Sequence, residues 1–305
     1  MVAVGESLLQ EAGAKGQEGF NDHHPRRRRE KKWTKWDKIA VVSVSATHLL
    51  GFCGLFCFSW SRFGAALLIG IVTSLFGINL SYHRHLTHKS FKLPKWLEYS
   101  FAYCGVHALQ GDPLSWVSNH RFHHQYTDTE RDPHSPVVGF WHSHMGWIFD
   151  SSSIKEKCGK RGNVGDLEKQ AFYRWIRKTY VIHPLSLAIL LYSLGGFPYI
   201  CWGIGVRVVC CYHATWSVNS AAHIWGSQDW NTNDLSRNNW WVAIMTFGEG
   251  WHNNHHAFNN SARHGLEWWQ IDVTWYVVKF LQAMGLAYDV KLPTLVQREK
   301  MAIKS

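Results

Sequence analysis

The sequence IAVVSVSATHLLGFCGLFCFSW at residues 39–60 is followed closely by FGAALLIGIVTSLFGINL at residues 63–80. Both stretches lack charged residues and have the length that a helix needs to cross a bilayer. Only Ser61 and Arg62 separate them. We therefore expect a helical hairpin of two spans, with the second ending at about residue 81.

Two further apolar stretches, at residues 185–204 and 206–224, predict a second hairpin. The third contains Gly195, Gly196 and Pro198, which spanning helices tolerate. A weaker apolar segment from Tyr99 to Val117 is interrupted by Gly-Asp-Pro at 111–113, which favours a re-entrant or interfacial position. The expected fold is an all-α membrane protein with four transmembrane helices in two hairpins and a cytosolic helical cap. We assign residues 39–293 to one domain, residues 1–38 to a flexible basic tail and residues 294–305 to a second tail.

Composition limits the function classes. The 305 residues are 46% hydrophobic and 18% charged, which excludes disorder for most of the chain. Much of the net charge of +10 lies in a basic run from Arg26 to Lys38, directly before the first span. Such a run indicates a cytosolic N-terminus and not a nucleic-acid partner. With two hairpins, both termini lie in the cytosol. The segments at residues 81–183 and 225–305 are then cytosolic as well.

The seven cysteines form no CxxC and are expected to be reduced.

Three histidine clusters lie in these cytosolic segments: His83-Arg-His-Leu-Thr-His88, His120-Arg-Phe-His-His124 and His252-Asn-Asn-His-His256. The i, i+3, i+4 spacing of the second and third clusters places three imidazoles on one helical face. His83 and His88 are five residues apart, so we expect a helix end or a bend there. His85 does not fit the spacing and is left out. Isolated histidines are expected to be structural or surface residues: His48, His107, His142, His144, His183, His213 and His264.

Ligand type narrows the choice of metal. Eight boxed imidazoles are too many for one four-coordinate zinc site, so two metal ions fit better. Among the metals that imidazole suits, iron and copper activate dioxygen. The carboxylate di-iron pattern needs Glu-x-x-His twice, and only Glu249-Gly-Trp-His252 matches it. A pair of ions held mostly by histidine is therefore favoured.

The three boxes resemble those of the membrane-bound fatty acid desaturases. Their context also matches at Asp132-Pro-His, Gly139-Phe-Trp, Asn219-Ser-Ala-Ala-His223, Gly248-Glu-Gly and Gly285-Leu-Ala-Tyr-Asp289. Over residues 36–293 the chain is similar to the delta-9 branch, which animal stearoyl-CoA desaturases and plant acyl-lipid desaturases share. The resemblance implies two iron ions held by nine histidines, with Asn219 holding a metal-bound water; the ligands would be His83, His88, His120, His123, His124, His223, His252, His255 and His256.

The resemblance also implies the reaction. The expected activity is O2-dependent introduction of a cis double bond, at the delta-9 position, into a saturated acyl chain carried on a lipid or CoA. Trp116, Trp147 and Trp225 are candidate tunnel or cap residues, with interfacial packing as the alternative. Animal members have Arg-Asp and Arg-Lys pairs that contact CoA, where this chain has Ser118-Asn119 and Asp150-Ser151. Losing these cations favours the plant-like members.

Electrons must come from another protein, because the sequence has no haem motif, dinucleotide fingerprint or iron–sulfur cysteine set. The family implies cytochrome b5 at the endoplasmic reticulum membrane, and the basic run at Arg26 to Arg29 is expected to assist its docking. A chloroplast membrane, with ferredoxin as donor, is the second expectation for location. A hydroxylase or other oxygen-inserting enzyme is the alternative activity. A metal transporter is less favoured, because its ligands would lie within the spans.

Overall fold

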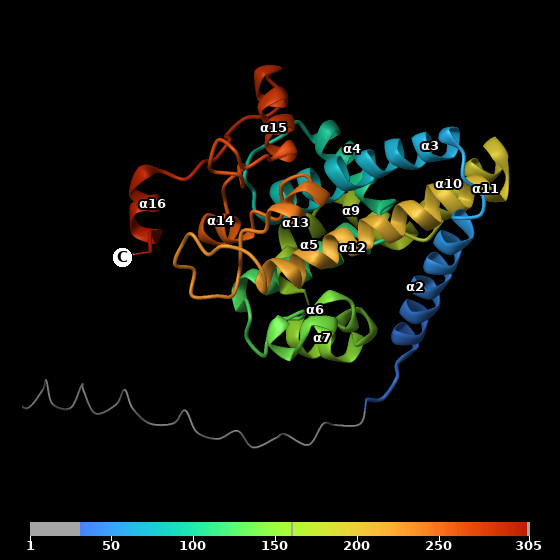
Figure 1. Cartoon of the computed structure of the whole chain (residues 1–305), viewed down its shortest axis with the longest axis horizontal. Coiled ribbons are helices and arrows are strands. Elements are labelled where there is room, and N and C mark those ends of the chain that lie inside the picture. Colours follow the sequence, from blue (N-terminus) through green and yellow to red (C-terminus); the bar gives the residue numbers. More distant parts are fainter. Residues whose placement is uncertain (1–30, 160, 304–305) are drawn as a thin grey trace, which may run out of the picture. The chain divides into compact units, whose positions relative to one another are not determined.

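A computed structural model describes residues 31–159 and 161–303, and every regular element within these ranges is a helix (Figure 1). The extended pairs in this part of the chain are isolated bridges, such as Lys92 with Tyr288. The predicted helical fold is therefore confirmed for the described residues. By their contacts, residues 34–305 form a compact unit separate from residues 1–33. Arg26 to Arg29 lie outside the described residues.

Two helices occupy the region of the first predicted hairpin, with shifted ends. Helix α2 (Lys35–Gly54) begins at a capping box in which Thr34 accepts from the Asp37 backbone and Asp37 accepts from the Thr34 backbone. It ends six residues before the predicted boundary at residue 60. The next helix starts at Trp60 because the Ser59 side chain accepts from the Arg62 backbone and caps it.

Helix α3 (Trp60–Gly70) continues without a break into the π-helix η1 (Ile71–Thr87). Together they form a 28-residue apolar helix. By length and composition, it is the one helix within the described residues that could cross a membrane. Four spans were expected, and one such helix is found in this part of the chain, so the four-span topology is not confirmed.

The second predicted hairpin turns earlier than expected. Helix α10 (Ile182–Gly195) stops at Gly196, whose φ of 69° is a left-handed conformation that glycine adopts readily. The chain then forms one uninterrupted helical stretch from α11 (Phe197–Ile200) through the π-helix η5 (Cys201–Val206) to α12 (Arg207–Asn219). The predicted boundaries 185–204 and 206–224 are therefore wrong. Gly196 forms the turn, with Gly195 at the end of α10 and Pro198 in the first turn of α11.

The remaining helices are shorter than the stretches from α3 to η1 and from α11 to α12. Helices α4 (Lys95–Val106) and α5 (Pro113–Tyr126) flank the predicted interruption at 111–113, where Asp112 caps α5. The others are short: η2 (Pro136–Val138), α6 (Phe140–His144), η3 (Gly146–Phe149), α7 (Ser151–Cys158), η4 (Gly162–Val164), α8 (Gly165–Glu168), α9 (Ala171–Thr179), η6 (Ala221–His223), α13 (Trp240–Met245), α14 (His252–Ala257), α15 (Val273–Ala283) and α16 (Leu295–Met301). Helix α16 lies in the predicted C-terminal tail.

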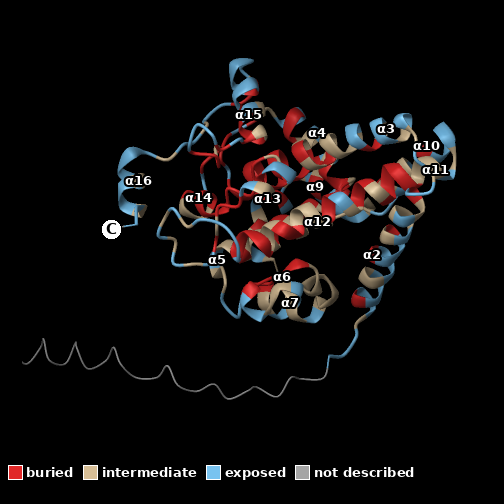
Figure 2. Ribbon diagram, viewed as in Figure 1, coloured by how far each residue is buried: buried red, intermediate tan, exposed pale blue. Residues whose placement is uncertain are grey.

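Glycines let the long helices approach closely. A Cβ added to Gly205 of η5 would lie 2.5 Å from the backbone nitrogen of Gly51 in α2. Helices with small residues at their contact can bring backbones together, as in membrane helix pairs. Figure 2 shows buried residues at the centre, where α5, α12 and α14 meet, and exposed ones along the outer sides of α2, α3 and α10. Many of these exposed side chains are large and apolar, including Leu49, Leu68 and Leu190.

Candidate metal centre

The structure gathers the nine predicted histidines into two groups. Cluster A contains His83, His88, His120, His124 and His255, and cluster B contains His123, His223, His252 and His256. Within each cluster the nearest ring nitrogens all lie within 4.8 Å of one another. The second and third boxes each contribute to both clusters. The spacing alone could not show this division, because i, i+3 and i+4 share one broad helical face.

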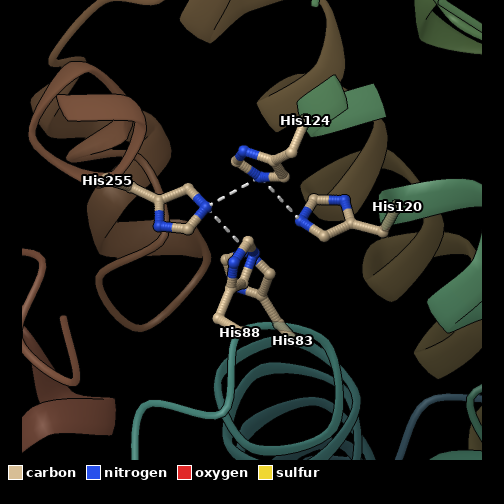
Figure 3. Close-up of side chains that lie close together, drawn as sticks. All are labelled: His83, His88, His120, His124 and His255. Carbon is tan, nitrogen blue, oxygen red and sulfur yellow. Dashed lines mark hydrogen bonds between the residues drawn. The ribbon is translucent and has the colours of Figure 1, made fainter. Parts of the chain in front are cut away.

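Figure 3 shows the five imidazoles of cluster A pointing toward one centre from three segments. His83 and His88 come from η1 and its C-cap, and the backbone N–H of His88 donates to the carbonyl of His83. Hydrogen bonds between residues i and i+5 characterise the π-helix, so this winding brings two histidines five apart onto the same side. The predicted helix end at the first box is confirmed.

Helix α5 positions its histidines from a fixed start. The carboxylate of Asp112 accepts the backbone N–H groups of Leu114 and Ser115, each at 3.1 Å, and Pro113 occupies the first turn. His223 of cluster B comes from a different element than Asn219. Helix α12 ends at Asn219, and His223 lies in the separate 3₁₀ turn η6, so the two residues do not share one helix face.

The nitrogen–nitrogen distances fit shared metal ions. In cluster A, the Nε2 atoms of His83 and His124 lie 3.1 and 3.0 Å from Nε2 of His255. In cluster B, Nε2 of His252 lies 3.0 Å from those of both His223 and His256. Two nitrogens each about 2.1 Å from one ion, at right angles, lie about 3.0 Å apart. Nε2 of His88 is buried and has no hydrogen-bond partner, as expected of an atom that a metal would bind.

Burial keeps most of these imidazoles neutral. It lowers the pKa of His88, His120 and His124 well below the ordinary value, and the neighbouring imidazoles lower it further. The pKa values of His252, His255 and His256 are lowered for the same reasons. Neutral imidazole is the form that binds a metal, and it suits iron, copper, nickel and zinc. The residues present therefore fit a pair of transition-metal ions.

Four of the nine imidazoles contact a carboxylate through Nδ1, on the side of the ring away from the cluster centre. His83 donates its Nδ1–H to Glu249 at 2.6 Å. The Nδ1 atoms of His123, His223 and His256 lie 2.9, 3.1 and 2.9 Å from Asp132, Asp128 and Asp234, respectively. A carboxylate on Nδ1 fixes the tautomer and leaves the Nε2 lone pair for a metal.

Glu249 belongs to a buried network and not to a Glu-x-x-His ligand pair. It accepts two hydrogen bonds from Arg84, at 3.0 and 2.8 Å, and Arg84 also donates to Asp272. His264, expected to be structural or a surface residue, is 1% exposed and its Nδ1 lies 3.0 Å from Glu249. Its ring centre lies 4.4 Å from that of His255. His264 is thus a buried neighbour of cluster A.

Sequence reasoning missed the outer carboxylates. Asp132 lies in the Asp-Pro-His motif, but the motif does not indicate that its carboxylate contacts His123. Asp128 and His223 are 95 residues apart in the chain, so only the fold could pair them. His85, which was left out, turns away from both clusters, and its ring nitrogens lie 3.0 and 3.2 Å from Phe91 O and Glu98.

A cavity of about 330 Å³ opens beside cluster A. His120, Asn119 and Asn219 line it, together with apolar side chains such as Val44 of α2 and Trp216 of α12 and polar ones such as Gln110 and Thr215. The predicted tunnel residues Trp116 and Trp147 also line it. Trp225 does not; it is 52% exposed and packs on Phe140. The cavity is therefore a largely apolar space that reaches His120 of cluster A.

Comparison with known proteins identifies the family of this chain. Residues 58–291 match the sequence model of the fatty acid desaturase family. The chain is 63% identical to the palmitoyl-monogalactosyldiacylglycerol delta-7 desaturase, chloroplastic, of Arabidopsis thaliana, over 90% of this chain and 74% of that protein. It is 58% identical to the delta-9 desaturase-like 3 protein of the same plant, over 90% and 91%. It is 56% identical to an acyl-CoA 5-desaturase of Anemone leveillei, over 90% and 85%. The chain therefore belongs to the fatty acid desaturase family and is an oxidoreductase.

Proposed function

We propose that this protein uses O2 and two iron ions to introduce a cis double bond, at the delta-9 position, into a saturated acyl chain. The nine histidines of clusters A and B would hold the iron, and Asn219 would hold a metal-bound water. The observation that carries the proposal is the convergence of nine imidazoles, most of them kept neutral by burial, on two centres beside an apolar cavity.

Iron, when bound, supplies the reduction of O2 that drives removal of two hydrogens from unactivated methylene groups. Each turnover converts one CH2–CH2 pair, one O2, two electrons and two protons into CH=CH and two waters. The protein contributes position. A chain held in one register places one pair of methylenes beside the metal, which replaces a random encounter by an effectively intramolecular one.

The cavity supports an extended acyl chain as the substrate. Val44, Tyr212 and Trp216 form apolar walls, and His120 lies where the cavity meets cluster A. Because the double bond forms beside the metal, the depth of the cavity determines its position on the chain. The relatives' names cover delta-7, delta-9-like and 5-desaturases, so small differences in this depth would separate them.

The acyl carrier is proposed to be a membrane lipid, with CoA as the second candidate. Ser118 is buried and donates to Asn163, and Asp150 caps α7 by accepting from the Ser153 backbone. Ser151 donates its backbone N–H to Asp37. The positions at which animal members have CoA-binding cations are thus occupied here by neutral or acidic side chains with structural hydrogen bonds. A phosphate would gain little from them.

The membrane arrangement is proposed from the outer surface of the helices. Large apolar side chains are exposed on α2, α3 and α10, as expected of helices that face lipid. We propose four spans with both termini in the cytosol, at the endoplasmic reticulum, and cytochrome b5 as electron donor. The relative that is 63% identical carries the word chloroplastic in its name, so a plastid membrane with ferredoxin is the second candidate.

Expression in a yeast that lacks its own delta-9 desaturase tests the function. Fatty acids would be profiled by chain length and double-bond position, with the His123→Ala variant as the inactive control. The proposal expects new monounsaturated chains with the wild type alone. Unsaturation at another position would correct the regiochemistry, and hydroxylated chains would instead support an oxygen-inserting enzyme. Reduction assays with cytochrome b5 and ferredoxin in parallel would identify the donor.

A further inference from the structure

The two histidine clusters differ in the charge that surrounds them. We propose that they bind iron with unequal affinity and that cluster B takes the first ferrous ion. The inference rests on the proposed function, because it takes both clusters to be iron sites. It concerns the outer residues of this chain, which set the electrostatic potential at each site.

Three of the four imidazoles in cluster B each contact a different carboxylate. His123 pairs with Asp132, His223 with Asp128 and His256 with Asp234, at 2.9–3.1 Å. The side chains of all three aspartates are at most 9% exposed, so water screens their charges little.

Within the described residues, no lysine or arginine forms an ion pair with the three carboxylates of cluster B, and their ion pairs are all with histidines. Their other hydrogen bonds come from neutral donors, such as the backbone N–H groups of Leu235 and Ser236. The Nζ atom of Lys157 donates to the backbone carbonyl of Asp132 and not to the Asp132 carboxylate. Three negative charges therefore face the ion that cluster B would hold.

Cluster A is surrounded differently. Among its five imidazoles, one carboxylate is found, Glu249 on His83. The same carboxylate accepts two hydrogen bonds from the fully buried Arg84, whose guanidinium is shared with Asp272. Within the described residues, His83 is the one imidazole of cluster A that has an acidic partner, and Arg84 offsets the charge of that partner, Glu249. An ion in cluster A is therefore stabilised mainly by neutral nitrogens.

Ligand number and outer charge predict opposite orders of loading. Cluster A offers five imidazoles and cluster B four, so ligand count alone favours cluster A. Outer carboxylates on metal-bound histidines are worth about 10- to 100-fold each in metal affinity. Cluster B has three such partners, whereas the charge of the one partner at cluster A is offset by Arg84. This difference in affinity outweighs the gain from the one additional neutral ligand of cluster A. We therefore expect the first ferrous ion to bind cluster B at least about tenfold more tightly.

Anaerobic titration with ferrous iron alone tests the order of loading. The full chain would be stripped with a chelator in detergent, and binding followed by equilibrium dialysis, which does not depend on activity. The wild type is expected to show two phases that differ at least about tenfold in affinity. Asp234→Asn keeps the shape of the side chain but removes one charge, and is expected to weaken the tight phase at least about tenfold.

Two ligand variants assign the phases. His256→Ala is expected to abolish the tight phase, whereas His88→Ala is expected to keep it and to lose the weaker one. Because Glu249→Gln would disturb the buried Arg84 network, His88→Ala carries the comparison for cluster A. Loss of the tight phase in His88→Ala, or indistinguishable phases in the wild type, would overturn the inference. Failure of the folded wild type to bind any iron would contradict the proposed function instead.

Discussion

Gly77 of η1 lies so close to Gly105 of α4 that a Cβ on Gly77 would be 2.4 Å from the backbone nitrogen of Gly105. Gly77 is six residues before His83 in the same helix. The packing of η1 on α4 therefore also determines the position of the first histidine box. Gly77→Ala must push the two backbones apart, which costs about 1–3 kcal/mol when a well-packed contact is overfilled. We expect a lower thermal unfolding temperature and weaker iron retention.

The matched control for Gly77→Ala is Gly64→Ala. Gly64 lies in α3, and an added Cβ there meets no atom within 4 Å. Alanine is the better helix former, so this variant should leave the unfolding temperature unchanged or raise it. Equal losses in both variants would show that the Gly77 contact has no special role.

Filling the cavity should change which acyl chains react. Val44 of α2 lines the cavity and is 7% exposed, so Val44→Phe would shorten the space available for substrate. We expect a shift toward shorter acyl chains, or toward a different double-bond position, in the fatty-acid profile. Val42→Phe is the control, because Val42 is 68% exposed on the same helix. An unchanged profile in Val44→Phe would mean that the substrate lies elsewhere.

The sequence predicted the metal residues better than the helix boundaries. The histidine spacing identified eight of the nine members of the two clusters, because metal binding places strong limits on which side chains can converge, and the family resemblance added His223. The hairpin at Gly196 was misplaced, since hydropathy does not change across Gly195 and Pro198 and cannot show that a left-handed turn lies between them. Asp128 and Asp234 could not be predicted, because their partners are distant in sequence and carboxylates on loops are common.

Acid should destabilise the metal-free protein through its buried histidines. Burial, with the charge of Arg84 acting in the same direction, lowers the pKa of His264 from its ordinary 6.5 to about 4. Between these values the unfolded chain binds a proton that the folded chain does not, so stability falls as pH falls from 6.5 toward 4. At pH 5 the loss is about 2 kcal/mol for such a group. Thermal unfolding of chelator-treated protein at pH 7.5 and pH 5 would measure it.

His264→Gln isolates this contribution. Glutamine cannot be protonated in this range, so the variant should lose less stability between pH 7.5 and pH 5 than the wild type does. Other buried histidines, including His134 with a pKa lowered to about 3, continue to contribute and prevent the slope from vanishing. A slope identical to that of the wild type would show that His264 is not the group that titrates.

The cap of α5 should affect the site without touching it. Asp112 accepts the backbone N–H groups of Leu114 and Ser115, and the helix that it starts carries His120 and His124. Asp112→Ala removes an N-cap worth about 0.5–2 kcal/mol and lets the first turn fray. We expect a lower unfolding temperature together with faster loss of iron to a chelator, whereas Asp112→Asn, which retains an oxygen acceptor, should largely preserve both. Thr294 caps α16, so Thr294→Ala is the control for losing a cap elsewhere. If Asp112→Ala and Thr294→Ala released iron at the same rate, the start of α5 would have no part in holding the metal centre.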